Sequence, residues 1–153
     1  MSSSTDRIER KVLLSATPAR VWRALSNAEE FGTWFGVSLK GETFAPGKSA
    51  KGRVTHPGYD HLIWNVVIER MEPERLLSWR WHPHAIEADQ DYSNEPTTLV
   101  TFELQKTEGG TLLTITESGF DQVPPERRTT AFRGNSEGWD EQTRRIAKHV
   151  ATP

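Results

Sequence analysis

Apolar and polar residues alternate along much of the middle of the chain, which is the period of a half-buried β-strand. The first such segment is Arg7 to Leu14. Others follow after a gap, separated by turn residues such as Pro and Gly. The pattern therefore predicts a largely antiparallel sheet with further strands at Ala50–His56, Leu62–Met71, Arg75–His82, Thr97–Lys106 and Thr111–Gly119, and a weaker strand within Val37–Phe44.

Helical spacing replaces this alternation in two parts of the chain. Thr17 can cap a short helix with Pro18 at its first position, and Asn27 can cap a second one over Ala28–Trp34. Helices this short are not stable alone, so both must pack on something larger. A long helix is predicted from Pro124 to Val150, with a stripe that would face the sheet: Phe132, Asn135, Trp139, Thr143, Ile146 and Val150.

Two glycines, Gly134 and Gly138, lie inside the long predicted helix. Each costs about 1 kcal/mol relative to Ala in a helix interior. They indicate close approach to a neighbour, a kink, or room left for something else, and the sequence leaves these three readings open.

Strand pairing sorts the side chains of the sheet into two faces. If the turn after Met71 pairs it with Leu76, Ile68 lies opposite Trp79, and an apolar face forms against a polar one. One face of a half-buried sheet is therefore predicted to be rich in Trp.

The second hairpin turns at Gly109 and Gly110, which pairs Leu104 with Leu113 and Val100 with Glu117. This register places a carboxylate among apolar residues. Glu117 could lie inside a cavity, where burial disfavours its charged form and it could anchor a ligand or act as an acid or base. It could equally pair with an Arg or cap backbone donors where the strand ends.

Composition narrows the function classes. The 153-residue chain has six Trp, no Cys and a formal net charge of −2. The absence of Cys excludes disulfides, a Cys nucleophile and thiolate metal sites, and it suits a cytoplasmic location. No charge bias or long apolar run points to a nucleic-acid partner or a membrane. Residues 1–6 are expected to be a disordered N-terminus before a single domain, 7–150, and no cofactor is indicated.

Several short sequence motifs occur together along the chain. Each motif has low specificity by itself, but their combination and order are fairly specific for one family. The motifs are Ala16–Leu25, Trp34–Phe35, Pro73–Leu77, Thr98–Leu104, Thr116–Phe120 and Gly138–Trp139. By these motifs the chain resembles bacterial relatives of the C-terminal domain of the activator of heat-shock-protein-90 ATPase, in the START-like helix-grip superfamily (SRPBCC).

The resemblance implies an α+β helix-grip fold, in which a curved antiparallel sheet of six or seven strands wraps around a long C-terminal helix. It also implies a cavity between the two that binds apolar or aromatic molecules in many relatives. It implies no reaction, because the superfamily mixes carriers, sensors and enzymes. Chaperone activation does not carry over, since the eukaryotic activator also uses a separate N-terminal domain. One departure is Thr143, where the family usually has Leu, so the cavity wall is expected to be more polar there.

The expected cavity brings together aromatic residues of the sheet, the short helices and the long helix. Strand direction places His56, His82 and the start of the long helix at one end of the sheet, where we expect the mouth. The candidate ligand-binding residues are Trp34, Phe35, Val54, His56, Trp64, Trp79, Trp81, Phe102, Glu117, Phe120, Phe132, Asn135 and Trp139.

Four histidines and several aspartates fall near the same sheet end, and imidazole with carboxylate can bind zinc. Their spacing fixes no pair of ligands, so no metal site is predicted from His56, His61, His82, His84, Asp60, Asp89 and Asp91. His149, in the last helical turn, is expected to interact with the helix dipole.

The sequence thus favours binding of a small apolar or aromatic molecule without catalysis. Two alternatives stay open: a cyclase- or hydrolase-like enzyme using Glu117 with a nearby His, and a protein interaction or co-chaperone-like module with a vestigial cavity. No Ser elbow or phosphate-binding loop supports other chemistry. A homodimer also stays open, because exposed strand edges can pair.

Overall fold

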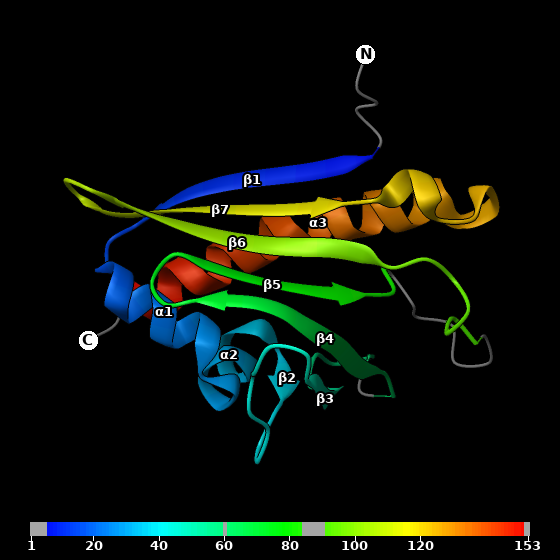
Figure 1. Cartoon of the computed structure of the whole chain (residues 1–153), viewed down its shortest axis with the longest axis horizontal. Coiled ribbons are helices and arrows are strands. Elements are labelled where there is room, and N and C mark those ends of the chain that lie inside the picture. Colours follow the sequence, from blue (N-terminus) through cyan, green and yellow to red (C-terminus); the bar gives the residue numbers. More distant parts are fainter. Residues whose placement is uncertain (1–5, 60, 84–90, 152–153) are drawn as a thin grey trace.

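The computed structural model describes residues 6–59, 61–83 and 91–151. Within them, one seven-stranded antiparallel sheet packs against a long C-terminal helix (Figure 1). The predicted α+β helix-grip architecture is confirmed. The strands are β1 (Arg7–Leu14), β2 (Val37–Ser38), β3 (Ser49–Val54), β4 (Ile63–Glu72), β5 (Leu76–Trp81), β6 (Thr98–Thr107) and β7 (Gly110–Ser118). The helices are α1 (Pro18–Ser26), α2 (Ala28–Phe35), the 3-10 turn η1 (Phe120–Gln122) and α3 (Pro125–Ala151).

Strand order in the sheet is β1-β7-β6-β5-β4-β3-β2. The first strand therefore lies beside the last, and α1 and α2 lead the chain from β1 across to the opposite edge. Figure 1 shows α3 running along one face of the sheet, with α1 and α2 beside its C-terminal half. These two short helices and α3 together cover the face that carries the core.

The short helices form for the local reasons that the sequence indicates. The Thr17 hydroxyl accepts a hydrogen bond from the Arg20 amide at 3.2 Å, and the Asn27 side chain accepts one from the Glu30 amide at 2.9 Å. Each cap satisfies a backbone donor that would otherwise be free at a helix start. Helix α2 ends at Phe35 and is capped by Gly36, whose φ of 97° lies in the left-handed region that favours glycine.

The hairpin registers agree with the prediction except at one point. Leu104 pairs with Leu113 in β6 and β7, as expected, and Ile68 pairs with Trp79 in β4 and β5. Met71, however, pairs with Leu77 rather than Leu76. An irregularity between Ile68 and Arg70 adds one residue to β4, as a β-bulge does, and so absorbs the difference.

The core is centred on the ring of Phe31 in α2, which is completely buried. This ring contacts aromatic side chains from its own helix, from the loop after β2 and from the sheet. Burial of one such side chain contributes about 1.5–3 kcal/mol. The partners, with ring centroids 4.7–5.6 Å away, are Trp34, Phe35, Phe44, Trp64 and Trp79.

Polar contacts hold β1 to neighbouring elements. On β1, Arg10 donates to the Asp140 carboxylate at 2.6 Å and to the Ser136 hydroxyl at 2.7 Å, both on α3. Asp6, which we expected to be the last residue of a disordered terminus, accepts the Asp121 amide at 3.0 Å. Residues 1–5, the rest of that expected terminus, lie outside the described residues.

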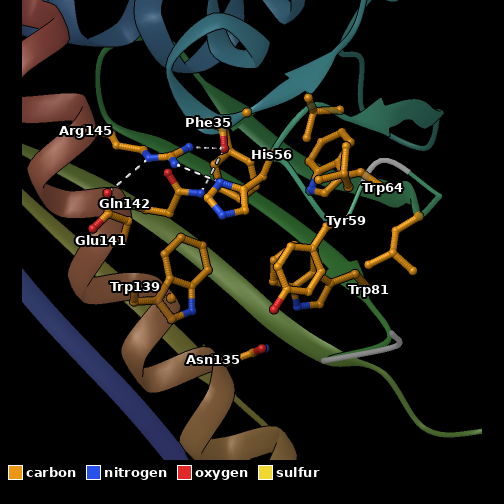
Figure 2. Close-up of a pocket in the computed structure, with 15 residues that line it drawn as sticks. Phe35, His56, Tyr59, Trp64, Trp81, Asn135, Trp139, Glu141, Gln142 and Arg145 are labelled. Atoms are coloured by element: carbon orange, nitrogen blue, oxygen red, sulfur yellow. Dashed lines mark hydrogen bonds and ion pairs between the residues drawn. The ribbon is translucent and has the colours of Figure 1, made fainter. Parts of the chain in front are cut away.

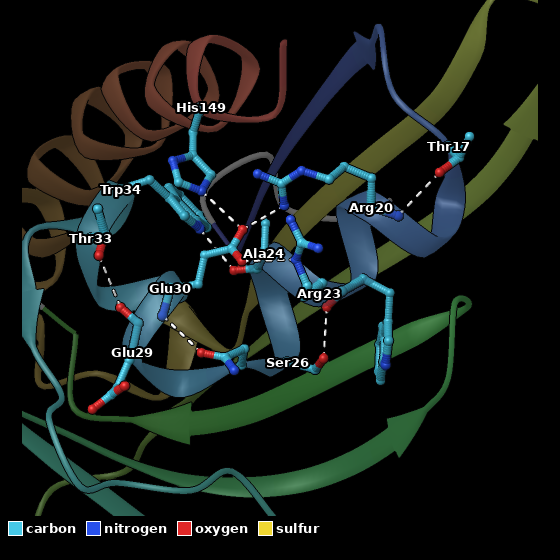
Figure 3. A network of polar contacts seen from close by, with 12 residues as sticks. Thr17, Arg20, Arg23, Ala24, Ser26, Glu29, Glu30, Thr33, Trp34 and His149 are labelled. Carbon is cyan, nitrogen blue, oxygen red and sulfur yellow. Dashed lines mark hydrogen bonds and ion pairs between the residues drawn. The ribbon is translucent and has the colours of Figure 1, made fainter. Parts of the chain in front are cut away.

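A carboxylate cluster fastens the C-terminal end of α3 to α1 and α2 (Figure 3). Glu30 of α2 accepts hydrogen bonds from Arg20 at 2.5 Å and Arg23 at 3.1 Å, and His149 of α3 lies 3.0 Å from it. The side chain of His149 thus has a carboxylate partner in addition to its place near the helix end. Burial alone would raise the pKa of Glu30, but hydrogen bonds from Arg20 and His149, the charge of Arg20 and the Arg23 hydrogen bond together hold it below its usual value.

This cluster predicts how stability depends on pH. The pKa of Glu30 is lower in the folded chain than its ordinary value of 4.5, so its contribution is present above that pH and is lost as the pH falls through the lowered pKa. Replacement of Glu30 by Gln should lower the free energy of unfolding by about 1–2 kcal/mol at pH 7. The difference from the parent protein should shrink towards pH 3, measured as Tm by circular dichroism.

The matched control is Glu69→Gln. Glu69 pairs with Arg80 at 2.9 Å, but both side chains are largely solvated, with 40% and 44% exposure. Its substitution should change stability by less than about 0.5 kcal/mol. A Glu30→Gln deficit that is undiminished at pH 3 would contradict the assignment.

Candidate functional site

An open pocket of about 340 Å³ lies between α3, the end of α2 and the turn that joins β3 to β4 (Figure 2). One wall is aromatic, and the side nearest the middle of α3 carries polar groups. The lining residues are Phe35, Gly36, Val37, Val54, His56, Tyr59, Leu62, Trp64, Trp81, Asn135, Gly138, Trp139, Glu141, Gln142 and Arg145.

The backbone carbonyl of Phe35, at the C-terminal end of α2, fixes one side of the pocket. It accepts hydrogen bonds from the Gln142 amide at 2.9 Å and from the Arg145 guanidinium at 3.3 Å. Carbonyls at a helix end lack partners within the helix, and a cation is favoured there. The two side chains come from neighbouring turns of α3 and therefore hold α2 and α3 at a set separation.

Charges beside this carbonyl are paired among themselves. Arg145 lies 3.3 Å from the Glu141 carboxylate and 3.5 Å from the His56 ring nitrogen (Figure 2). Hydrogen bonds from Arg144 and Arg145 are the largest influences that lower the pKa of Glu141. At this end of the pocket the positive charge of Arg145 is therefore opposed by a carboxylate.

The aromatic wall consists of rings that pack on one another. Phe35 lies 6.5 Å from Trp81 and 6.1 Å from Trp139, measured between ring centroids, and the two Trp rings are 6.0 Å apart. The three rings come from α2, β5 and α3. Such contacts stabilise by about 0.5–1.5 kcal/mol each beyond simple burial, so the wall is a packed surface rather than a set of independent side chains.

Glu117 lies behind this wall and is completely buried. One carboxylate oxygen accepts from the Trp139 indole at 2.8 Å, and the other accepts from the Trp81 indole at 2.8 Å and the Thr98 hydroxyl at 2.5 Å. The Asn135 amide donates to both oxygens at 3.0 Å. Indole and amide N–H groups can only donate, and the Thr98 hydroxyl can also donate, so all of these contacts suit a carboxylate that accepts on both oxygens.

This arrangement differs from both readings that the sequence left open for Glu117. Within the described residues it forms no ion pair with Arg, Lys or His, and its partners are side chains rather than backbone donors. It does not line the pocket either, whereas three of its four partners, Trp81, Asn135 and Trp139, do. The carboxylate therefore holds side chains of the pocket wall in position without facing the pocket itself.

Comparison with known proteins identifies the family. The family model described as Activator of Hsp90 ATPase homolog 1-like protein (AHSA1) matches residues 15–151, nearly the whole chain. The chain belongs to the AHSA1 family. This confirms the resemblance inferred from the sequence motifs, and it places the chain in the START-like helix-grip superfamily. A search of curated proteins found no match.

Solved structures share the fold of this AHSA1 domain at low sequence identity. A crystal structure of a protein from Mesorhizobium loti has a TM-score of 0.72 and 23% identity, covering 95% of this chain and 96% of that one. A solution structure of an Arthrobacter aurescens protein gives 0.76 and 18%, covering 99% and 91%. A Mycobacterium smegmatis protein gives 0.73 and 14%, covering 99% and 94%. Identities this low establish the fold alone.

Seven residues that were predicted for the cavity of this AHSA1 domain line the pocket together. They are Phe35, Val54, His56, Trp64, Trp81, Asn135 and Trp139. The pocket includes the turn after β3 and the end of β5, as expected for the mouth. On α3, however, it lies against residues 135–145 rather than against the start of the helix.

Six other predicted residues lie away from the pocket surface because packing or hydrogen bonding occupies them. Trp79 and Phe102 are completely buried in the core beneath the wall, and the Trp34 indole donates to the Ala24 carbonyl at 2.9 Å. Phe120 and Phe132 pack on each other with centroids 5.2 Å apart near the start of α3. The sixth is the buried carboxylate described above.

The residues that the sequence reasoning missed are mostly small or polar. On α3 they follow the helical period from Asn135 through Gly138 and Gln142 to Arg145, a stripe next to the apolar one. Their helical spacing is visible in the sequence, but the spacing alone does not show that this side of the helix faces a cavity. The missed residues are Gly36, Val37, Tyr59, Leu62, Gly138, Glu141, Gln142 and Arg145.

Thr143 and Gly138 of α3 differ in how they lie relative to the pocket. Thr143 does not line the pocket, so it does not make the wall more polar; its hydroxyl donates back to the Asp140 carbonyl at 2.8 Å. Around Gly138, a Cβ would meet nothing within 4 Å. Of the three readings left open for the glycines, room beside the helix is the one found at Gly138.

The histidines do not form a cluster within the described part of the chain. His56 lies near Tyr59 and Arg145, and the His82 ring lies 3.0 Å from the Glu95 carbonyl. No three His, Asp or Glu side chains there are placed to hold a metal ion. Asp60, His84 and Asp89 lie outside the described residues. No described helix is both long and apolar enough to cross a membrane.

The Glu117 site predicts a large effect of an uncharged replacement. In Glu117→Gln, the new amide N–H₂ group must face donors, so at least one buried N–H or hydroxyl loses its partner. The free energy of unfolding should fall by about 3 kcal/mol, which lowers Tm by about 6–12 °C in a domain of this size. Thermal unfolding followed by circular dichroism measures this.

Glu103→Gln is the matched control, since Glu103 lies exposed on the neighbouring strand β6. It should change the free energy of unfolding by less than about 0.5 kcal/mol. Equal Tm values for the two variants would contradict the role assigned to Glu117.

Proposed function

We propose that this AHSA1 domain binds one small apolar or aromatic molecule in the pocket between the sheet and α3. The observation that carries the proposal is the open space itself, about 340 Å³ with Phe35, Trp64, Trp81 and Trp139 among its walls. Ligand sites span about 300–1,000 Å³ and are lined mainly by hydrophobic and aromatic groups. A volume at the small end of this range suits a compact ligand.

A rigid wall also supports binding. Trp81 and Trp139 are fixed through Glu117, and α2 is fixed to α3 through the Phe35 carbonyl. A site that is formed before the ligand arrives avoids the entropy cost of ordering side chains on binding. The interaction-module alternative would require side chains to fill the cavity, and the open volume instead favours the ligand-binding reading.

The enzyme alternative receives no support from Glu117. A general acid or base must reach the substrate, directly or through one water. Glu117 is completely buried, does not line the pocket, and has both oxygens engaged by four side chains. The geometry therefore favours a carrier, sensor or similar binding role over catalysis by this carboxylate.

Gly138 offers a test that separates binding from folding. In Gly138→Leu the new side chain enters the space beside α3, so the Kd for a small apolar probe, 3-ethylindole, should rise at least about tenfold as contact area is lost. Stability should stay equal or rise by up to about 1 kcal/mol, because Leu favours helix over Gly. Isothermal calorimetry gives the Kd, and thermal unfolding gives the stability.

Gly138→Ala is the matched control. It brings the same gain in helix propensity but adds a single methyl group where a Cβ meets nothing within 4 Å. Its Kd for 3-ethylindole should stay within about threefold of the parent value. Unchanged binding by Gly138→Leu would place the ligand elsewhere and contradict the proposal.

A further inference from the structure

A buried carboxylate lies directly behind the aromatic wall of the pocket. Glu117 is 0% exposed, and in the described part of the chain no cationic side chain pairs with it. Hydrogen bonds from neutral donors stabilise the ionised form of such a carboxylate, but they do not cancel its net charge. In a low-dielectric interior, the field of an uncompensated charge extends further than it would in water.

Two indole side chains connect this carboxylate to the pocket. Trp81 and Trp139 each donate their N–H to the carboxylate at 2.8 Å, and both line the pocket. An indole face attracts cations because of its negative quadrupole. Donation of the N–H to an anion polarises the ring further in the same direction. Both rings are thus better partners for a cation than for an anion.

Asn135 contributes an acceptor at the same place. The carboxylate of Glu117 can only accept, so the amide NH₂ of Asn135 must face it, as the 3.0 Å contacts show. The amide carbonyl oxygen takes no part in these contacts, and the residue lines the pocket (Figure 2). A ligand N–H or ammonium group could donate to this oxygen. Gly138, nearly one turn further along α3, leaves space beside it.

The positive charge of the pocket lies at its other end. Arg145 is ten residues beyond Asn135 on α3, which is about 15 Å along the helix axis. Its guanidinium is engaged by the Phe35 carbonyl and the Glu141 carboxylate and lies near His56. The end of the pocket formed by Trp81, Trp139 and Asn135 therefore favours positive charge without competition from Arg145.

We propose that the ligand is an organic cation: an apolar, aromatic body that carries a protonated amine against Trp81, Trp139 and Asn135. The inference rests on the proposed function and names the chemical class of its ligand. The apolar body occupies the aromatic part of the pocket. The ammonium group lies over the indole faces, donates to the Asn135 carbonyl, and gains from the field of Glu117.

Four probes with one skeleton test the charge. Tryptamine carries an ammonium group, tryptophol a hydroxyl, indole-3-propionate a carboxylate and 3-ethylindole none of these. We expect tryptamine to bind about tenfold more tightly than tryptophol or 3-ethylindole, and indole-3-propionate to bind most weakly, in isothermal calorimetry at pH 7. Equal affinities of tryptamine and tryptophol would overturn the inference and leave the proposed function standing. Failure of all four probes to bind would contradict both.

Variants then locate the source of the preference. Glu117→Gln should reduce the tryptamine-to-tryptophol ratio of affinities to about twofold or less, because the charge is gone. Both affinities are measured in the same variant, so a general loss of affinity from a looser wall cancels in the ratio. Asn135→Leu removes the acceptor but keeps the carboxylate, so the ratio should fall about threefold; this variant keeps the test decisive if Glu117→Gln does not fold.

Asp140→Asn is the matched charge control. Asp140 lies on the same helix but pairs with Arg10 on β1 and does not line the pocket. Its removal should leave the ratio within about twofold of the parent value. A full preference for tryptamine in a folded Glu117→Gln variant, or an equal loss in Asp140→Asn, would show that the buried carboxylate is not its source.

Discussion

The interaction on which the rest of the structure depends is the burial of one carboxylate among neutral donors. An ionised group removed from water is very costly unless its hydrogen-bonding capacity is met. Here that requirement is met by side chains from β5, β6 and α3, which converge on Glu117 of β7. Because every donor must stay in place, the spacing between the sheet and the long helix is set by this group. The same hydrogen bonds make the pocket wall rigid.

The ends of the pocket are fixed by contacts of a different kind. Polar side chains of α3 reach a helix-terminal carbonyl on α2, a cation on β1 and a carboxylate cluster between the short helices. These contacts lie on several sides of α3, so the helix can neither slide along the sheet nor roll on it without breaking some of them. The open pocket persists beside this helix because polar contacts at several points, and not only apolar packing, hold the helix in position.

Much of the fold could be predicted because its determinants are local. Alternation, helix caps and turn residues act over a few positions, and they placed the strands of the second hairpin in their observed register, with Glu117 opposite Val100. The bulge near Glu69 was not predicted, because two consecutive polar residues, Glu69 and Arg70, are too short a break in the alternation to identify a bulge. At the site, aromatic residues were predicted and the polar stripe of α3 was not. Whether Gln142 or Arg145 faces a cavity depends on where α2 ends in space, and no pattern within α3 records that. For the same reason, the donors to Glu117 could not be derived from β7 alone.

The gap at Gly138 has a consequence for how this site can change over time. Pocket size at this point is limited by the absence of a side chain, so one substitution can shrink it while leaving the packed wall intact. The polarity of the wall, unlike the pocket size, cannot be changed by a single substitution. Trp81, Thr98, Asn135 and Trp139 share one acceptor, so none of the five can be exchanged without leaving another unmatched. The size of the pocket is therefore open to stepwise change, whereas the polarity of its wall is tied to a coupled set of residues that must change together.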